Sequence, residues 1–143
     1  MSKITKLREL HASIKSFTFE MQKYHWTIKG KGFYTLHKAF EELYDWGFEQ
    51  EDEIAERLLI IGEKPVLALP QIIELNKIRV LEEADLVESK MIDNLRDAFA
   101  TLLTLAREAL VLCEEEDVGT DGLLSDFIAD VEKRAWMLRA YLA

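Results

Sequence analysis

Apolar side chains recur every three or four positions along most of this chain, which is the spacing of one face of an α-helix. The first such run predicts a helix over about residues 3–29, and Gly30 and Gly32 supply the signal that ends it. Its predicted core face consists of Ile4, Leu7, Leu10, Ile14, Phe17, Met21, Tyr24 and Ile28.

The segment after Gly32 predicts a second long helix, with Thr35 as its cap and with Gly62 and Pro65 ending it. Its predicted core face consists of Leu36, Phe40, Leu43, Gly47, Ile54, Leu58 and Ile61. A second, offset face carries His37, Glu41, Phe48, Asp52 and Glu56. This helix therefore presents one face for packing and another that is rich in possible ligands.

The rest of the chain predicts a long connection and two further helices. Pro70 suits the first turn of a short helix over about 70–76, within a connection that spans 63–80 and can reach from one end of a bundle to the other. A third long helix is predicted over about 81–116, with Leu81, Ala84, Met91, Leu95, Ala98, Leu102, Leu105, Ala109 and Leu110 inward. Thr120 is the predicted cap of a fourth, over 121–142, with Leu124, Phe127, Ile128, Val131, Leu138 and Leu142 buried.

Four long helices with one long crossover are typical of a ferritin-like four-helix bundle, here with a short extra helix between the second and third long helices. The 143 residues suffice for one sizeable core and are too few for two ordinary domains, so 1–143 is predicted to be a single domain.

Composition narrows the classes of function. The formal net charge of −9 argues against a broad nucleic-acid surface, which normally carries a basic stripe. No apolar run is long enough to span a membrane, and no apolar signal core is present near the first residues. Cys113 is the single cysteine and cannot form an internal disulfide, so a reducing cytoplasm is the simplest expected compartment.

Two ligand pairs lie on the second helix. His37 and Glu41 are four residues apart, as are Asp52 and Glu56, so each pair shares a helix face. Mixed imidazole and carboxylate ligation suits a divalent first-row metal. The pairs are separated by about 22 Å of helix at ~1.5 Å per residue, so one helix cannot bring both to one ion.

A second copy of the same helix can complete the set. The two pairs are symmetric about a point beside Gly47, so two copies crossing antiparallel at that point bring His37 and Glu41 of one copy to Asp52 and Glu56 of the other. A two-fold interface of this kind produces two identical sites. A close crossing would account for a glycine in a helix interior, although Gly47 can equally accommodate a bulky neighbour such as Trp46 or Phe48.

A site inside a single bundle is not expected. The usual bundle di-iron site needs Glu-x-x-His pairs, and this chain has none. His11 is expected to be a surface or partly buried residue. Taken alone, the remaining candidates can also be purely structural: His25 and His37 as packed histidines, and the three carboxylates as solvated charges beside Glu42, Glu49, Glu51 and Glu53.

The run Y-H-W-T-I-K-G-K-G-F-Y-T-L-H-K-A-F-E-E-L-Y-D, from Tyr24 to Asp45, resembles the Dps family, the small ferritins of starved bacterial cells. The similarity continues through D-E-I-A-E-R at Asp52, G-E-K-P at Gly62 and the segment Glu132 to Leu142. It implies five iron ligands at a ferroxidase site: His25, His37 and Glu41 from one subunit, and Asp52 and Glu56 from its two-fold mate. His25 enters only through this resemblance.

The resemblance also implies roles for four further residues. Trp26 matches a tryptophan beside the iron site that can pass electrons, and packing is its alternative role. The acid-rich corner with Asp117, Asp121 and Asp126 is the candidate three-fold pore. Here the usual T-x-D is T-D-G, with Gly122 where an aspartate is expected, and these acids could equally be helix-start residues favoured by the helix dipole.

The function implied is oxidation of Fe²⁺ to Fe³⁺, with hydrogen peroxide as the preferred oxidant and oxygen slower, and storage of ferric mineral in a shell of twelve subunits. The alternatives are a protein that binds and compacts DNA, and a shell that has lost activity and serves as a scaffold. Members that bind DNA usually carry a lysine-rich tail, and almost nothing precedes the first predicted helix, so weak or no DNA binding is expected.

Overall fold

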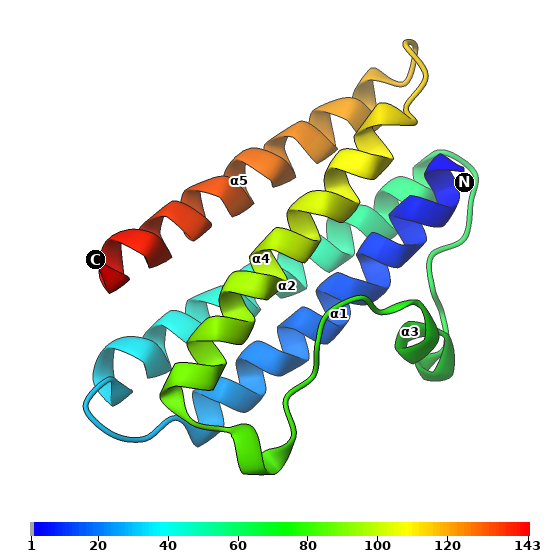
Figure 1. The fold of residues 1–143 in the computed structure, drawn as a ribbon. Coiled ribbons are helices and arrows are strands. Elements are labelled where there is room, and N and C mark those ends of the chain that lie inside the picture. Colours follow the sequence, from blue (N-terminus) through cyan, green and yellow to red (C-terminus); the bar gives the residue numbers. More distant parts are fainter. Residues whose placement is uncertain (1) are drawn as a thin grey trace.

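A computed structural model describes residues 2–143, and within that range helices are the only regular secondary structure. The long helices α1 (Lys3–Thr27), α2 (Phe33–Ile60), α4 (Glu88–Val111) and α5 (Val118–Leu142) form a four-helix bundle (Figure 1). The predicted all-α architecture is therefore confirmed. No helix among the described residues combines the length and the apolar character that crossing a membrane requires.

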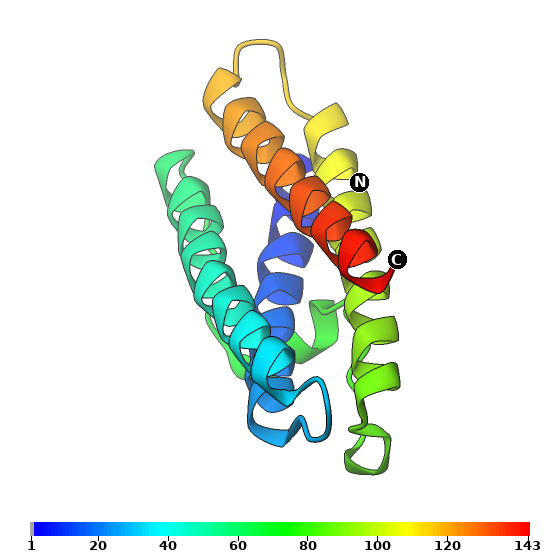
Figure 2. The same ribbon diagram turned by 90° about the vertical axis from the view of Figure 1, so that its left-hand side faces the viewer.

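The connection between α2 and α4 runs the length of the bundle. α2 and α4 point in the same direction, so the chain has to return from one end to the other between them (Figure 1). The connection includes the short helix α3 (Leu69–Leu75), which packs on α1, and the 3-10 turn η1 (Glu83–Asp85) just before α4. The view turned by 90° shows α3 on the side of α1 away from α5 (Figure 2).

Polar side chains of α1 hold this connection in place. The backbone N–H of Val66 donates to Nδ1 of His11 (3.3 Å), and that of Lys77 donates to Oγ of Ser13 (3.0 Å). Farther along, the N–H of Leu81 donates to Oε2 of Glu20 (3.2 Å). A buried backbone group without a partner is costly, so these bonds explain why α1 buries polar residues on the side that faces the crossover. His11, expected to be a surface or partly buried residue, is instead buried, because its Nδ1 serves as an acceptor for this connection.

The core is centred on α1, which contacts α2, α3 and α4, while α5 packs mainly on α4. The predicted apolar faces of α1 and α2 are confirmed, and the largest fully buried side chains are Tyr24, Phe17, Phe40, Phe127, Leu7, Leu10, Ile14, Met21, Ile54, Leu58, Met91 and Leu102. Trp46 is also buried: its ring stacks on Phe127 and its Nε1–H donates to Asp130 (2.7 Å).

Gly47 is required by packing within the chain. A Cβ at this position would lie 2.2 Å from Oγ1 of Thr18 on α1 and 3.3 Å from its Cβ. This contact within the chain accounts for the glycine without a second copy. The crossing of two copies near Gly47 and the accommodation of Trp46 or Phe48 stay predictions. The close approach that needs a glycine is the one between α1 and α2.

Both predicted helix caps are wrong. α2 begins at Phe33 after Gly32, two residues before Thr35, and no side chain caps it. α5 begins at Val118, and its cap is Asp117, whose side chain accepts from the backbone N–H of Thr120 (3.2 Å). Thr120 lies inside the helix and is fully buried.

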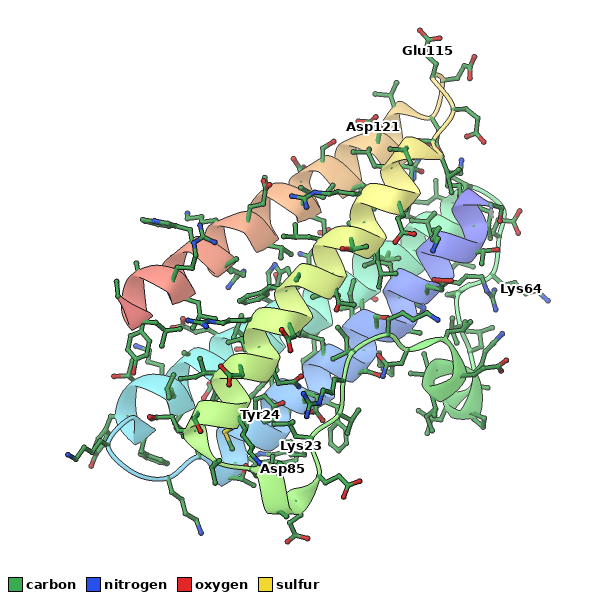
Figure 3. All side chains as sticks on the ribbon, in the orientation of Figure 1. Lys23, Tyr24, Lys64, Asp85, Glu115 and Asp121 are labelled. Carbon is green, nitrogen blue, oxygen red and sulfur yellow. The ribbon has the colours of Figure 1, made fainter. Side chains whose placement is uncertain are left out.

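The predicted third long helix is too long at both ends. α4 starts at Glu88, because residues 81–87 form an irregular segment tied to α1 through Leu81. Ala84, predicted to face inward, is exposed in η1. α4 ends at Val111, and the acidic residues Glu114, Glu115 and Glu116 lie in the turn before α5. Glu115 and Asp121 mark this corner at one end of the bundle (Figure 3).

Candidate metal centre

His25 and His37 meet where the end of α1 lies beside the start of α2. Nδ1 of His25 donates to the backbone carbonyl oxygen of His37 (2.7 Å), and Nδ1 of His37 donates to the carbonyl oxygen of His25 (2.8 Å). A carbonyl oxygen only accepts, so each ring carries its proton on Nδ1 and leaves the Nε2 lone pair available. Fixing the tautomer in this way is the usual arrangement of metal-binding histidines.

Ring stacking holds the two imidazoles in place. Their centroids lie 3.7 Å apart with an interplanar angle of 17°. Phe33 stacks on the other face of His37, at 4.7 Å and 20°. Tyr44 packs its edge against His25 at 5.4 Å. The pair is thus supported from both sides by aromatic residues of α2.

Glu41 completes the half of the candidate site that one chain provides. Its Oε1 lies 3.8 Å from Nε2 of His25, and its side chain is 51% exposed. Neither Nε2 atom has a hydrogen-bond partner within residues 2–143. Imidazole nitrogen and carboxylate oxygen are donors that suit a divalent first-row ion. In the described part of the single chain, however, these three side chains are not grouped closely enough to hold one.

Asp52 and Glu56 do not join this group. Both are exposed on α2, near its other end. Among the residues that the structure describes, no three His, Cys, Asp or Glu side chains are grouped closely enough to hold a metal ion. The single chain therefore contains two separated parts of the predicted ligand set.

An exposed apolar surface lies near Asp52. A hollow of about 530 Å³ between α1, α2 and α3 is lined in part by Phe19, Phe48, Ile72 and Ile73. A second hollow of about 470 Å³ is lined by Phe48, Asp52 and four further residues, His11, Glu49, Glu51 and Ala55. Glu51, predicted to be a solvated charge, is instead mostly buried and paired with Lys15 at 3.0 Å.

Trp26 is exposed over 64% of its surface and touches the ring of Phe19 edge-on at 6.5 Å. It therefore has little packing role within the chain. Phe19 and Trp26 are seven residues apart and so share one face of α1, which is not the face of His25. Phe19 also lines the larger hollow, and a large exposed aromatic next to an apolar hollow is a common mark of an interaction surface.

The three acids of the candidate pore have different environments. Asp117 forms ion pairs within the chain: its Oδ1 accepts a hydrogen bond from Arg57 (2.9 Å), and its Oδ2 accepts one from Lys3 (2.7 Å). The hydrogen bonds from Lys3, Thr120 and Arg57 hold the pKa of this carboxyl well below its usual value. Asp121 and Asp126 are exposed, and Gly122 faces open space.

Sequence reasoning missed two features of this region. The reciprocal histidine bonds depend on the relative placement of α1 and α2, for which the chain has no local signal. The Asp117 cap did have one, since aspartate is among the residues preferred at the position just before a helix start.

Comparison with known proteins identifies the class. The model of the ferritin-like domain family matches residues 6–143. DNA protection during starvation protein 2 of Bacillus anthracis is 36% identical over 123 residues, which cover 86% of this chain and 84% of that protein. The DNA protection during starvation protein of Listeria innocua is 35% identical over 136 residues, covering 92% and 85%.

Comparison with solved structures leads to the same class of protein. The crystal structure of the Dps protein from Vibrio cholerae O1, described as a member of a broad superfamily of ferritin-like diiron-carboxylate proteins, superimposes with a TM-score of 0.91. It is 34% identical, and the match covers 96% of this chain and 87% of that one. The fold and the matched domain define a ferritin-like protein. Within that class, this chain belongs to the Dps family.

Proposed function

We propose that this protein is a ferroxidase and iron-storage mini-ferritin, whose sites are shared between two subunits. The observation that carries the proposal is the locked histidine pair, which keeps two Nε2 lone pairs available beside Glu41. Asp52 and Glu56 would come from a two-fold mate, because the single chain leaves them at the other end of α2. The family membership supports this arrangement, and so does the exposed apolar hollow that shares Phe48 with the hollow lined by Asp52.

In this proposal Fe²⁺ is the substrate. His25 and His37 bind the ferrous ion, and the carboxylates of Glu41, Asp52 and Glu56 favour the ferric product as positive charge builds up. Two ferrous ions supply the two electrons that reduce one hydrogen peroxide, with two protons, to two water molecules. Paired one-electron oxidation of this kind avoids release of hydroxyl radical. Peroxide is the proposed preferred oxidant and oxygen the slower one.

The product is proposed to mineralise inside a cytoplasmic shell of twelve subunits built from two-fold dimers. Asp121 and Asp126 are the carboxylates free to line a three-fold pore, while Asp117 is already occupied by Lys3 and Arg57. Trp26 is proposed to supply electrons from the exposed side of the histidine pair.

The test is Fe²⁺ oxidation followed by absorbance, with peroxide and with oxygen. His37→Ala and Asp52→Ala are expected to lose fast oxidation, while Glu42→Ala, which removes an exposed carboxylate of the same helix, keeps it. Equal rates in all four proteins would show that the assigned ligands do not form the site.

Subunit mixing tests the sharing of the site. When His37→Ala and Asp52→Ala chains are unfolded and reassembled together, each mixed dimer has one site with every ligand intact. Random pairing then restores about a quarter of the wild-type sites, because half the dimers are mixed. Absence of rescue in intact shells would place the site within one subunit.

DNA binding and compaction is the second candidate, and the Bacillus anthracis relative's name refers to DNA protection. The net charge of −9 favours weak binding or none at physiological salt. A gel shift of the assembled protein that is tight and salt-sensitive would contradict this expectation.

A further inference from the structure

Arg57 follows the proposed ligand Glu56 directly and donates hydrogen bonds to two residues of another helix. Its Nε donates to Oγ1 of Thr120 (2.9 Å) and its NH2 group donates to Oδ1 of Asp117 (2.9 Å). Both partners belong to the start of α5. The guanidinium is therefore held in one plane by two acceptors on a different helix.

Gly119 adds a steric element to this contact. A Cβ at Gly119 would lie 2.5, 2.6 and 2.7 Å from three atoms of the Arg57 guanidinium. The two terminal nitrogens are the nearest of these atoms, so the NH1–NH2 end of the guanidinium lies against the glycine. The absence of a side chain at 119 is thus what lets Arg57 reach both acceptors.

The acceptors are themselves fixed. Asp117 caps α5 through the N–H of Thr120, and its second oxygen is held by Lys3 from α1. Lys3 also pairs with Glu114 in the turn before α5 (2.6 Å). Arg57 therefore connects the last turns of α2 to a point where the start of α1 and the start of α5 are already joined.

Apolar packing alone leaves the orientation of these turns less defined. Ile54 and Leu58 are fully buried and anchor the inner side of α2, but burial of apolar surface is non-directional. The hydrogen bonds of Arg57 are directional, and they fix how these turns of α2 are rotated about the helix axis. Asp52 and Glu56 are carried on the same turns, and both are exposed.

We propose that Arg57 is a positioning residue for the metal site: it locks the turns of α2 that carry Asp52 and Glu56 to the start of α5. The proposal rests on the proposed function, in which these two carboxylates bind iron across the two-fold interface. Arg57 does not touch the metal and acts through the orientation of the helix that carries Glu56.

The experiment measures Co²⁺ binding to the assembled protein, using affinity and the visible absorption spectrum as separate readouts. Thr120→Val removes the acceptor for Nε of Arg57 at nearly constant volume, and Thr120→Ser keeps the hydroxyl. We expect Thr120→Val to weaken Co²⁺ binding by at least about tenfold and to alter the spectrum, as loss of supporting contacts does in other metal sites. Thr120→Ser should restore both.

A second pair of variants tests geometry without changing charge. Gly119→Ala intrudes on the Arg57 guanidinium, whereas Gly122→Ala, three residues later in the same helix, meets nothing within 4 Å. Both changes raise helix propensity. We expect Gly119→Ala to reproduce the Thr120→Val spectrum and Gly122→Ala to match wild type.

The outcomes separate the two proposals. If wild-type protein shows no Co²⁺ spectrum that His37→Ala removes, the proposed function is wrong and the positioning role falls with it. If wild type binds Co²⁺ through His37 but Thr120→Val and Gly119→Ala bind it with unchanged affinity and spectrum, only the positioning role of Arg57 is overturned. A loss of thermal stability alone, without a change in Co²⁺ binding, is also a result against it.

Discussion

The contact between Gly47 and Thr18 makes a quantitative prediction about the packing of α1 on α2. Replacing Gly47 by alanine places a methyl group 2.2 Å from Oγ1 of Thr18. That hydroxyl cannot move freely, because it donates to the carbonyl oxygen of Ile14 (2.9 Å) within a fully packed crossing. The methyl group must therefore push α1 and α2 apart or break this hydrogen bond.

The expected magnitude comes from two opposing terms. Alanine gains about 1 kcal/mol of helix propensity over glycine. Overpacking of a tight interior contact costs about 1–3 kcal/mol. Gly47→Ala is therefore expected to lower the free energy of unfolding by up to about 2 kcal/mol.

Removing the hydroxyl group of Thr18 should reverse the sign of the effect that Gly47→Ala has on the free energy of unfolding. In a Thr18→Ala background the nearest atom to the new methyl group would be the Cβ of residue 18, at 3.3 Å, which needs only a shift of a few tenths of an ångström. Gly47→Ala is then expected to stabilise by up to about 1 kcal/mol through helix propensity. The coupling energy of the double-mutant cycle is expected to be about 1–3 kcal/mol.

The assay is guanidinium unfolding followed by far-UV circular dichroism for all four proteins at one protein concentration, since assembly contributes to apparent stability. Equal slopes with denaturant show that the same surface is exposed in each protein. Gly122→Ala in the same Thr18→Ala background is the control and should be additive, because position 122 faces open space. Additivity of Gly47→Ala with Thr18→Ala within about 0.5 kcal/mol would refute the contact.

Two further predictions concern pH. Hydrogen bonds from Lys3 and its neighbours lower the pKa of Asp117, so its contribution to stability is present above the ordinary carboxyl pKa of about 3.9 and is lost as pH falls below it. Asp117→Asn should lower the free energy of unfolding by about 1–3 kcal/mol at pH 7 and weaken its dependence on pH below pH ~4. An unchanged pH dependence in that range would contradict this. Burial lowers the pKa of His11 from 6.5 to about 4, so wild-type stability should fall as pH drops through that window. His11→Gln should remove that slope in urea titrations, and a retained slope would exclude His11 as its source.

The candidate site was partly predictable from the chain. The four-residue spacings placed His37 with Glu41 and Asp52 with Glu56 because helical periodicity is a local property. The resemblance to the Dps family added His25. The tautomers of the two histidines could not be predicted, because they depend on backbone carbonyls that α1 and α2 offer each other.

The fold was predictable in its main elements and less so at their ends. The long apolar periodicities identified four helices, since a 3.6-residue repeat sustained over many turns is specific to an amphipathic α-helix. Thr35 and Thr120 were reasonable caps by residue type, yet the helices begin at Phe33 and Val118. Helix ends depend on which partner a terminal group finds, and Thr120 finds Arg57.

By itself, the sequence determined the helical class, the core faces and the identity of the ligand candidates, because these follow from composition and short-range spacing. Only the tertiary structure decided what Gly47 packs against, which acids at the α4–α5 corner are already paired, and how His25 and His37 present their lone pairs. Each of these depends on contacts between residues from 12 to 114 positions apart. Such contacts form only when the packed core has set the distances between helices.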